Sequence, residues 1–144
     1  MNTRMLLIAL LLSLSALSSY STTDVESAIP TRGKIYHPGS DQQFHEVLNQ
    51  FDLVVVDFYA DWCGPCKQMH KVIEDLATDK ECEDILFIKV NTDHHRSLSN
   101  HFNIHSLPTI IFFVDGRPIR TLYGYQNKRD LKTAIKSAFR MPSA

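Results

Sequence analysis

The chain has 144 residues, a formal net charge of −1, and 44% hydrophobic and 22% charged residues. This length predicts one domain large enough to bury a core, and the nearly balanced charge argues against a surface built for nucleic acid. The three cysteines are too few for a disulfide-rich scaffold.

The first 18 residues have the pattern of a secretory signal peptide. Arg4 gives a short positive start, residues 5–12 are wholly apolar, and Ala16 and Ser18 supply small residues at a cleavage site. The alternative is an uncleaved anchor, but the apolar stretch is shorter than the ~20 residues that span a bilayer. We therefore expect a signal peptide at 1–18 and an exported protein, which would be periplasmic, secreted or in a secretory lumen.

Residues 19–33 are rich in serine and threonine and lack apolar periodicity, which is typical of a linker. The folded domain is expected over 34–141. It starts with a short edge strand at 34–37, after which Ser40 and Gln43 form a capping box for the first helix, at 41–50.

The rest of the domain alternates apolar strands with amphipathic helices. The expected elements are a strand at 53–59, a helix at 63–80, a strand at 85–91, a short helix around 94–102 capped by Asp93, two strands at 109–114 and 118–123 joined by the Asp115-Gly116 turn, and a last helix capped by Asn127. This order predicts a three-layer α/β domain. Its central mixed sheet has parallel central strands, an antiparallel hairpin and helices on both faces.

Cys63 and Cys66 lie where a buried strand is followed by a helix. The amino end of a helix favours an anion by about 0.3–2 kcal/mol, enough to lower an ordinary thiol pKa of about 8.5 by roughly one unit. We expect Cys63 to be the nucleophile and Cys66, further into the helix, to resolve the mixed disulfide. Gly64 leaves the first sulfur approachable, and Pro65 pre-sets helical geometry.

The alternatives to a redox pair are a zinc site and a purely structural disulfide. Zinc needs further ligands at suitable spacing. The only other candidates are Cys82 and scattered histidines. Four of these, His94, His95, His101 and His105, are interpreted as surface residues of a short helix and loop. We expect no metal and no cofactor. Cys82 lies between two glutamates that disfavour its thiolate, so we interpret it as a bystander.

The run Val56–Lys67, which reads VDFYADWCGPCK, resembles the active-site segment of the thioredoxin family. The similarity continues through residues 89–93, 107–109 and 115–116 and Gly124, and covers roughly residues 35–139. It implies the thioredoxin fold and a reversible dithiol/disulfide that acts on proteins. The chain departs from the family pattern at Tyr59, where tryptophan is usual, and at Lys71, where a proline kinks the helix.

Asp57 lies inside an apolar strand, where desolvation raises the pKa of a carboxyl group. The resemblance implies that Asp57 relays the proton of Cys66, and it implies that Lys89 is the charge partner of Asp57. The alternatives are a structural aspartate and an ordinary strand-end lysine that reaches solvent.

Pro108 precedes a strand, a place where proline is tolerated without any further role. The resemblance implies more: a cis Leu107–Pro108 bond packed beside the cysteines, next to a groove for an extended substrate peptide. It also implies that Trp62 and Gly124 border this groove.

The residues between the cysteines bear on the direction of the reaction. A histidine there would stabilise the Cys63 thiolate and make the pair more oxidising, whereas Gly64 and Pro65 donate nothing from a side chain. We therefore expect a monomeric reductant of disulfide-containing client proteins. It would depend on a thiol-disulfide electron donor, for which a membrane-borne protein is a candidate. The alternatives are a disulfide oxidase or isomerase, and a non-catalytic peptide-binding module.

Overall fold

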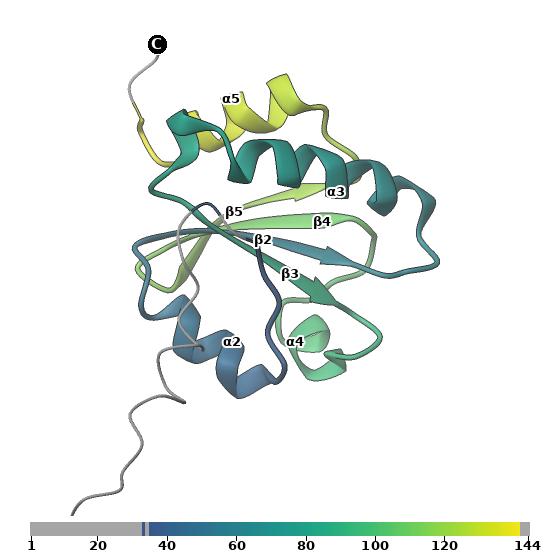
Figure 1. Ribbon diagram of the computed structural model, residues 1–144. Helices are drawn as coiled ribbons and strands as arrows, with labels where there is room; N and C mark the ends of the chain where they lie inside the picture. Colours follow the sequence, from purple (N-terminus) through teal and green to yellow (C-terminus); the bar gives the residue numbers. More distant parts are fainter. Residues whose placement is uncertain (1–32, 34, 142–144) are drawn as a thin grey trace, which may run out of the picture.

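A computed structural model describes residues 33 and 35–141, and the expected signal peptide at 1–18 and all but the last residue of the linker lie outside them. A five-stranded sheet forms the middle layer (Figure 1). The elements are β1 (Ile35–Tyr36), α2 (Asp41–Leu48), β2 (Leu53–Tyr59), α3 (Gly64–Ala77), the 3-10 turn η2 (Lys80–Cys82), β3 (Leu86–Asn91), α4 (Arg96–His101), β4 (Thr109–Val114), β5 (Arg117–Tyr123) and α5 (Lys128–Ala138). No helix in this part of the chain is long and apolar enough to cross a membrane.

The sheet has the strand order β1-β3-β2-β4-β5. β3 runs parallel to β1 and β2, whereas β4 is antiparallel to both β2 and β5. Helices α3 and α5 cover one face, and α2 and α4 cover the other (Figure 1). The three-layer prediction and the mixed sheet are therefore confirmed. Among the described residues, β1 pairs only with β3, so the expected edge strand is present.

Side chains alternate between the two faces of the sheet because the strand period is two residues. On the face of α3 and α5, the strands contribute Val55, Phe87, Ile110 and Phe112 to one core cluster. On the opposite face, Val54, Ile88, Ile111 and Phe113 belong to a second cluster. Asp57 follows Val55 by two residues, so the alternation places its carboxyl group on the same face of the sheet, between the sheet and α3.

The helix starts show how local hydrogen bonds set the boundaries. Ser40 caps α2 by accepting the N–H of Gln43 at 3.2 Å, as predicted. The Gln43 side chain does not return to Ser40, however, and accepts the N–H of Gly39 at 2.9 Å. Asn127 caps α5 through the N–H of Asp130, also as predicted.

One predicted helix start and the predicted end of α3 are wrong. Cys63 is the N-cap of α3, which agrees with the predicted start. The helix continues without interruption through Lys71 but ends at Ala77, three residues before the predicted end at Lys80. Asp93 does not cap α4: the N-cap is His95, with no side-chain hydrogen bond. The interpretation of His95 as a surface residue is also wrong, because its ring lies between Asp41, at 2.8 Å from Nδ1, and the Pro38 carbonyl, at 3.1 Å from Nε2.

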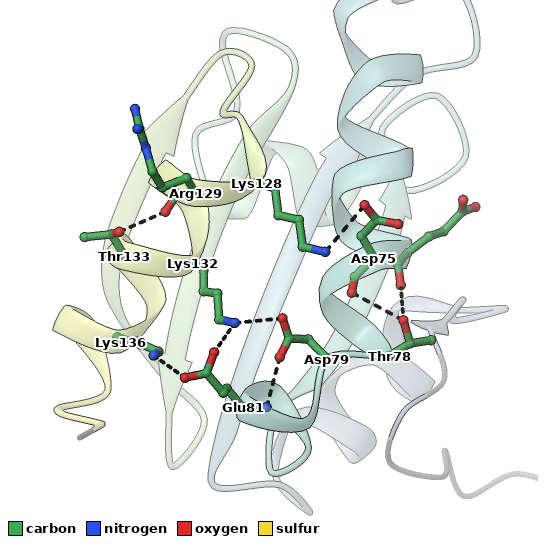
Figure 2. A network of polar contacts seen from close by, with 10 residues as sticks. Asp75, Thr78, Asp79, Glu81, Lys128, Arg129, Lys132, Thr133 and Lys136 are labelled. Atoms are coloured by element: carbon green, nitrogen blue, oxygen red, sulfur yellow. Dashed lines mark hydrogen bonds and ion pairs between the residues drawn. The ribbon is translucent and has the colours of Figure 1, made fainter. Parts of the chain in front are cut away.

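A charged network joins the segment after α3 to α5 (Figure 2). Lys132 pairs with both Asp79 and Glu81, and Lys136 pairs with Glu81 at 2.5 Å. The hydrogen bonds from Lys132 hold the pKa of Asp79 and that of Glu81 below their ordinary values. These contacts fix α5 against the segment that follows α3.

Candidate active site

Cys63 and Cys66 form a disulfide at the amino end of α3, with their Cα atoms 5.3 Å apart. Cys63 has extended backbone geometry as the N-cap, and its Sγ accepts the N–H of Cys66 at 3.2 Å. Pro65 lies in the first turn, where its missing N–H costs no helical hydrogen bond. The helix therefore directs a donor and its positive end at the first sulfur, which favours a thiolate there once the disulfide is reduced.

The two sulfurs differ in their access to solvent. Cys63 is 6% exposed and lines a surface groove of about 530 Å³, whereas Cys66 is fully buried and does not line it. A side chain at Gly64 would meet nothing within 4 Å, so the approach to the first sulfur is open. This asymmetry fits an attacking Cys63 and a resolving Cys66.

Trp62 forms one side of the groove and is 73% exposed. Its indole Nε1 donates a hydrogen bond to Asp93 at 2.9 Å. Asn91 ties the same loop to the end of β3, because its side-chain amide donates to Asp61 and its carbonyl oxygen accepts the N–H of Asp93. The aspartate expected to cap α4 therefore anchors the active-site loop.

Asp57 is buried on β2, and neither of its carboxylate oxygens has a hydrogen-bond partner among the residues that the structure describes. Burial raises the pKa of Asp57 to about 7, although the nearby Lys89 lowers it. This confirms the expected effect of desolvation on the carboxyl group. A group that titrates near neutral pH in a buried position can both accept and return a proton under physiological conditions.

Lys89 pairs with Asp57 in the register of the parallel strands β2 and β3. It is 7% exposed, and burial lowers its pKa against the opposing effect of Asp57. The Lys89 Nζ atom lies 4.9 Å from the centroid of the Tyr59 ring. The strand-end lysine is therefore held inward, beside the aspartate, and does not extend into solvent.

The Leu107–Pro108 bond is cis, as the resemblance implied. Leu107 packs against Ala60 and the two cysteines and lines the groove. The carbonyl of Pro108 accepts the N–H of Gly124 at 2.8 Å, so Gly124 lies directly beside it. Neither Pro108 nor Gly124 is among the residues that line the groove.

The far wall of the groove was missed by the sequence analysis. It consists of Thr92, Ile104, His105 and Ser106. These residues come from two loops that follow β3 and α4. Thr92 lies within the 89–93 segment of the resemblance, but no motif marks the other three. For Ile104, His105 and Ser106, the position next to Leu107 in the sequence is the signal that could have suggested them.

Cys82 lies in η2 and is 1% exposed. Burial is the largest cause that raises the pKa of its thiol, and the negative charge of Asp79 adds to the effect. The sequence analysis attributed the weak thiolate to the flanking glutamates alone, which is corrected here: the core around the thiol contributes more than they do.

The Thioredoxin family model matches residues 36–137. A thioredoxin of Mycoplasmoides gallisepticum is 39% identical over 100 residues, which cover 69% of this chain and 98% of that protein. A thioredoxin of Alicyclobacillus acidocaldarius is 36% identical over 96 residues, which cover 67% of this chain and 90% of that protein.

Solved structures give the same result. A mutant thioredoxin from Halobacterium salinarum superposes with a TM-score of 0.71 at 28% identity, covering 79% of this chain and 98% of that one. A thioredoxin of Plasmodium falciparum superposes with a TM-score of 0.65 at 35% identity, covering 70% of this chain and 96% of that one. Both the sequence and the fold of the described domain therefore match a single family.

Proposed function

Because the chain belongs to the thioredoxin family of protein-disulfide oxidoreductases, we propose that it acts in an exported compartment as a monomeric reductant of client disulfides. The observation that carries this proposal is the position of Cys63. Its sulfur accepts a hydrogen bond from the helix end and faces an open groove, with the second sulfur in disulfide contact behind it.

The reaction begins with the Cys63 thiolate attacking one sulfur of a client disulfide. The client S–S bond breaks, the departing sulfur leaves as a thiolate that takes up a proton, and a mixed disulfide joins Cys63 to the client. The Cys66 thiol then loses its proton and attacks the Cys63 sulfur. The client leaves with two thiols, and its two electrons have come from the pair, which ends as the disulfide seen in the structure.

Asp57 is the base that we assign to the second step. It is buried beneath α3 with both oxygens unpaired in the described structure, and its pKa of about 7 suits proton transfer at neutral pH. A water molecule would carry the proton from Cys66. Lys89 supports this role by stabilising the carboxylate that Asp57 must present when it accepts the proton.

Client peptides would bind along the groove and continue past Pro108. Trp62 and Leu107 provide exposed and half-buried apolar surface on either side of Cys63. The neighbouring Pro108 and Gly124 form the end of the sheet next to this surface. A shallow, open groove of this kind suits segments of many different proteins in preference to one small ligand.

Two features support work outside the cytosol: the signal-like segment at 1–18 and the serine-rich segment at 19–33. In such a compartment the oxidised pair must be reduced again by another thiol protein. We propose a membrane-borne donor, because a membrane protein can bring electrons across from the cytosol.

The equilibrium reduction potential tests the proposed direction. We expect a value near or below about −230 mV, toward the thioredoxin end of the known range, because Gly64 and Pro65 give the Cys63 thiolate no side-chain donor. The measurement is equilibration with a glutathione buffer of known ratio, followed by separation of the two redox forms.

The matched control is Pro65→His, which places a donor beside the Cys63 sulfur and is expected to raise the potential by tens of millivolts. A wild-type value near about −120 mV, typical of a strong thiol oxidase, would overturn the reductant role in favour of disulfide formation.

A further inference from the structure

Three side chains from three elements form a stack beside the active site. The rings of Tyr59, at the end of β2, and His70, on α3, meet edge to face with centroids 4.7 Å apart and an interplanar angle of 88°. On the same tyrosine ring, the Lys89 Nζ atom lies 4.9 Å from the centroid. A cation at this distance over an aromatic face is attracted by the negative charge of the ring face.

The fold places this stack next to the groups that move the proton. Tyr59 follows Asp57 by two residues, so both side chains lie on the α3 side of β2. Lys89 is the register partner of Asp57 on β3. On α3, His70 follows Cys66 by four residues and so lies one turn further along the same face of the helix.

The contact of the His70 ring with Tyr59 is one of packing. Its Nε2 atom is buried and has no hydrogen-bond partner among the described residues. Burial lowers the pKa of His70, and Lys89 lowers it further. The other charged groups that face it are Glu74 and Asp61, which oppose this shift, and His37, which adds to it. Burial therefore favours the neutral form of the ring.

We propose that Tyr59 and His70 form a clamp that positions the Lys89 ammonium beside Asp57. An unclamped lysine at a strand end extends its flexible stem and carries its charge into solvent. Here the tyrosine face holds the ammonium, and the histidine ring holds the tyrosine from the side of α3. Both are positioning residues, and their importance for catalysis rests on the proposed role of Asp57 as the base.

Loosening the clamp has a defined electrostatic consequence. Burial raises the pKa of Asp57, and Lys89 is the group that counteracts this effect. When the ammonium moves away from the carboxylate, less of the burial effect is offset. The pKa of Asp57 therefore rises when the clamp is removed, whereas simple entry of water into the site would lower it.

The test is an NMR titration of the Asp57 carboxyl carbon in the reduced full domain with its leader removed. His70→Leu keeps a side chain of similar volume but removes the ring. We expect it to raise the pKa of Asp57 by at least about half a unit, roughly a threefold change in the dissociation constant. His70→Phe restores the aromatic contact and should return the titration close to that of the wild type.

Four further variants make the test independent of the helix. Tyr59→Leu removes the ring face itself and should raise the same pKa, while His94→Leu, at an exposed loop histidine, should leave it unchanged. Lys89→Met should also raise the pKa of Asp57. Adding His70→Leu to Lys89→Met should cause no further rise, because both substitutions remove the same interaction between Lys89 and Asp57. An unchanged or lowered pKa in His70→Leu, a shift in His70→Phe as large as in His70→Leu, or additive shifts in the double variant would each overturn the clamp.

The pH profile of client reduction separates this inference from the function on which it rests. If Asp57 is the base, the profile of His70→Leu moves to higher pH together with the carboxyl titration. A titration that moves while the profile stays fixed would support the clamp and would overturn the role of Asp57 instead.

Discussion

Replacing Cys63 with serine is expected to abolish the reduction of protein disulfides. A serine hydroxyl is not ionised at neutral pH even at the end of a helix, so the attack on the client sulfur is lost. The turbidity assay of insulin reduction with dithiothreitol should show only the uncatalysed background. The buried Cys82 provides the matched control, because Cys82→Ser removes a thiol that the mechanism does not use and should retain full activity.

Cys66→Ser should fail in a different way. Cys63 is still at the helix end and in the groove, so the first attack proceeds, but no second sulfur is present to release the client. The mixed disulfide should therefore accumulate and appear as a dithiothreitol-sensitive adduct on a non-reducing gel. Adducts that form equally in Cys63→Ser and Cys66→Ser would contradict the assignment of the two roles.

Replacing Asp57 with asparagine should slow the release of the client and, at the same time, stabilise the fold. The amide cannot accept the Cys66 proton, so the resolving step should slow by up to about a hundredfold at pH 7, the lower end of the range for general base catalysis. Rapid-quench measurement of the mixed disulfide isolates this step. Its rate should recover at higher pH, where Cys66 loses its proton without help.

The effect of this substitution on stability follows from linkage. The pKa of Asp57 is about 7 in the folded protein against an ordinary value of 3.8, so between these pH values the folded state holds a proton that the unfolded state has released. The buried carboxyl group therefore reduces the free energy of unfolding as the pH rises through this window, by about 4 kcal/mol at most once the pH exceeds 7.

Asp57→Asn removes this loss, because the amide does not ionise. Urea unfolding should show the variant to be more stable than the wild type at pH 8 and similar to it at pH 4. The control is Asp52→Asn, an exposed acid immediately before the same strand. A stability difference that does not depend on pH would show that Asp57 does not titrate in this range.

The chemistry of the site could be predicted from the sequence because its main parts are local. Cys63 and Cys66 lie within one helical turn, and the strand and helix on either side have clear apolar periods. Asp57 stands out as the one acid in an apolar run. The cis bond at Pro108 followed from the resemblance alone, because nothing in the spacing of the residues requires it.

The remaining parts depend on contacts between distant segments, which a local pattern does not contain. Asp93 has the sequence context of a helix cap, but its carboxylate instead accepts a hydrogen bond from the Trp62 indole. His95 has the context of a surface residue, but the loop before α2 folds over its ring. The contact of Tyr59 with His70 and Lys89 likewise exists only because α3 crosses the paired ends of β2 and β3.

The rate at which the reduced protein is alkylated at Cys63 tests the central claim most directly. The helix end should lower the pKa of the Cys63 thiol, so that a larger fraction of it is thiolate at acidic pH. Iodoacetamide should therefore modify Cys63 at pH 6 about tenfold faster than it modifies free cysteine. Cys66 and Cys82, both buried, should remain unmodified under these conditions. A Cys63 thiol that reacts no faster than free cysteine would contradict the account.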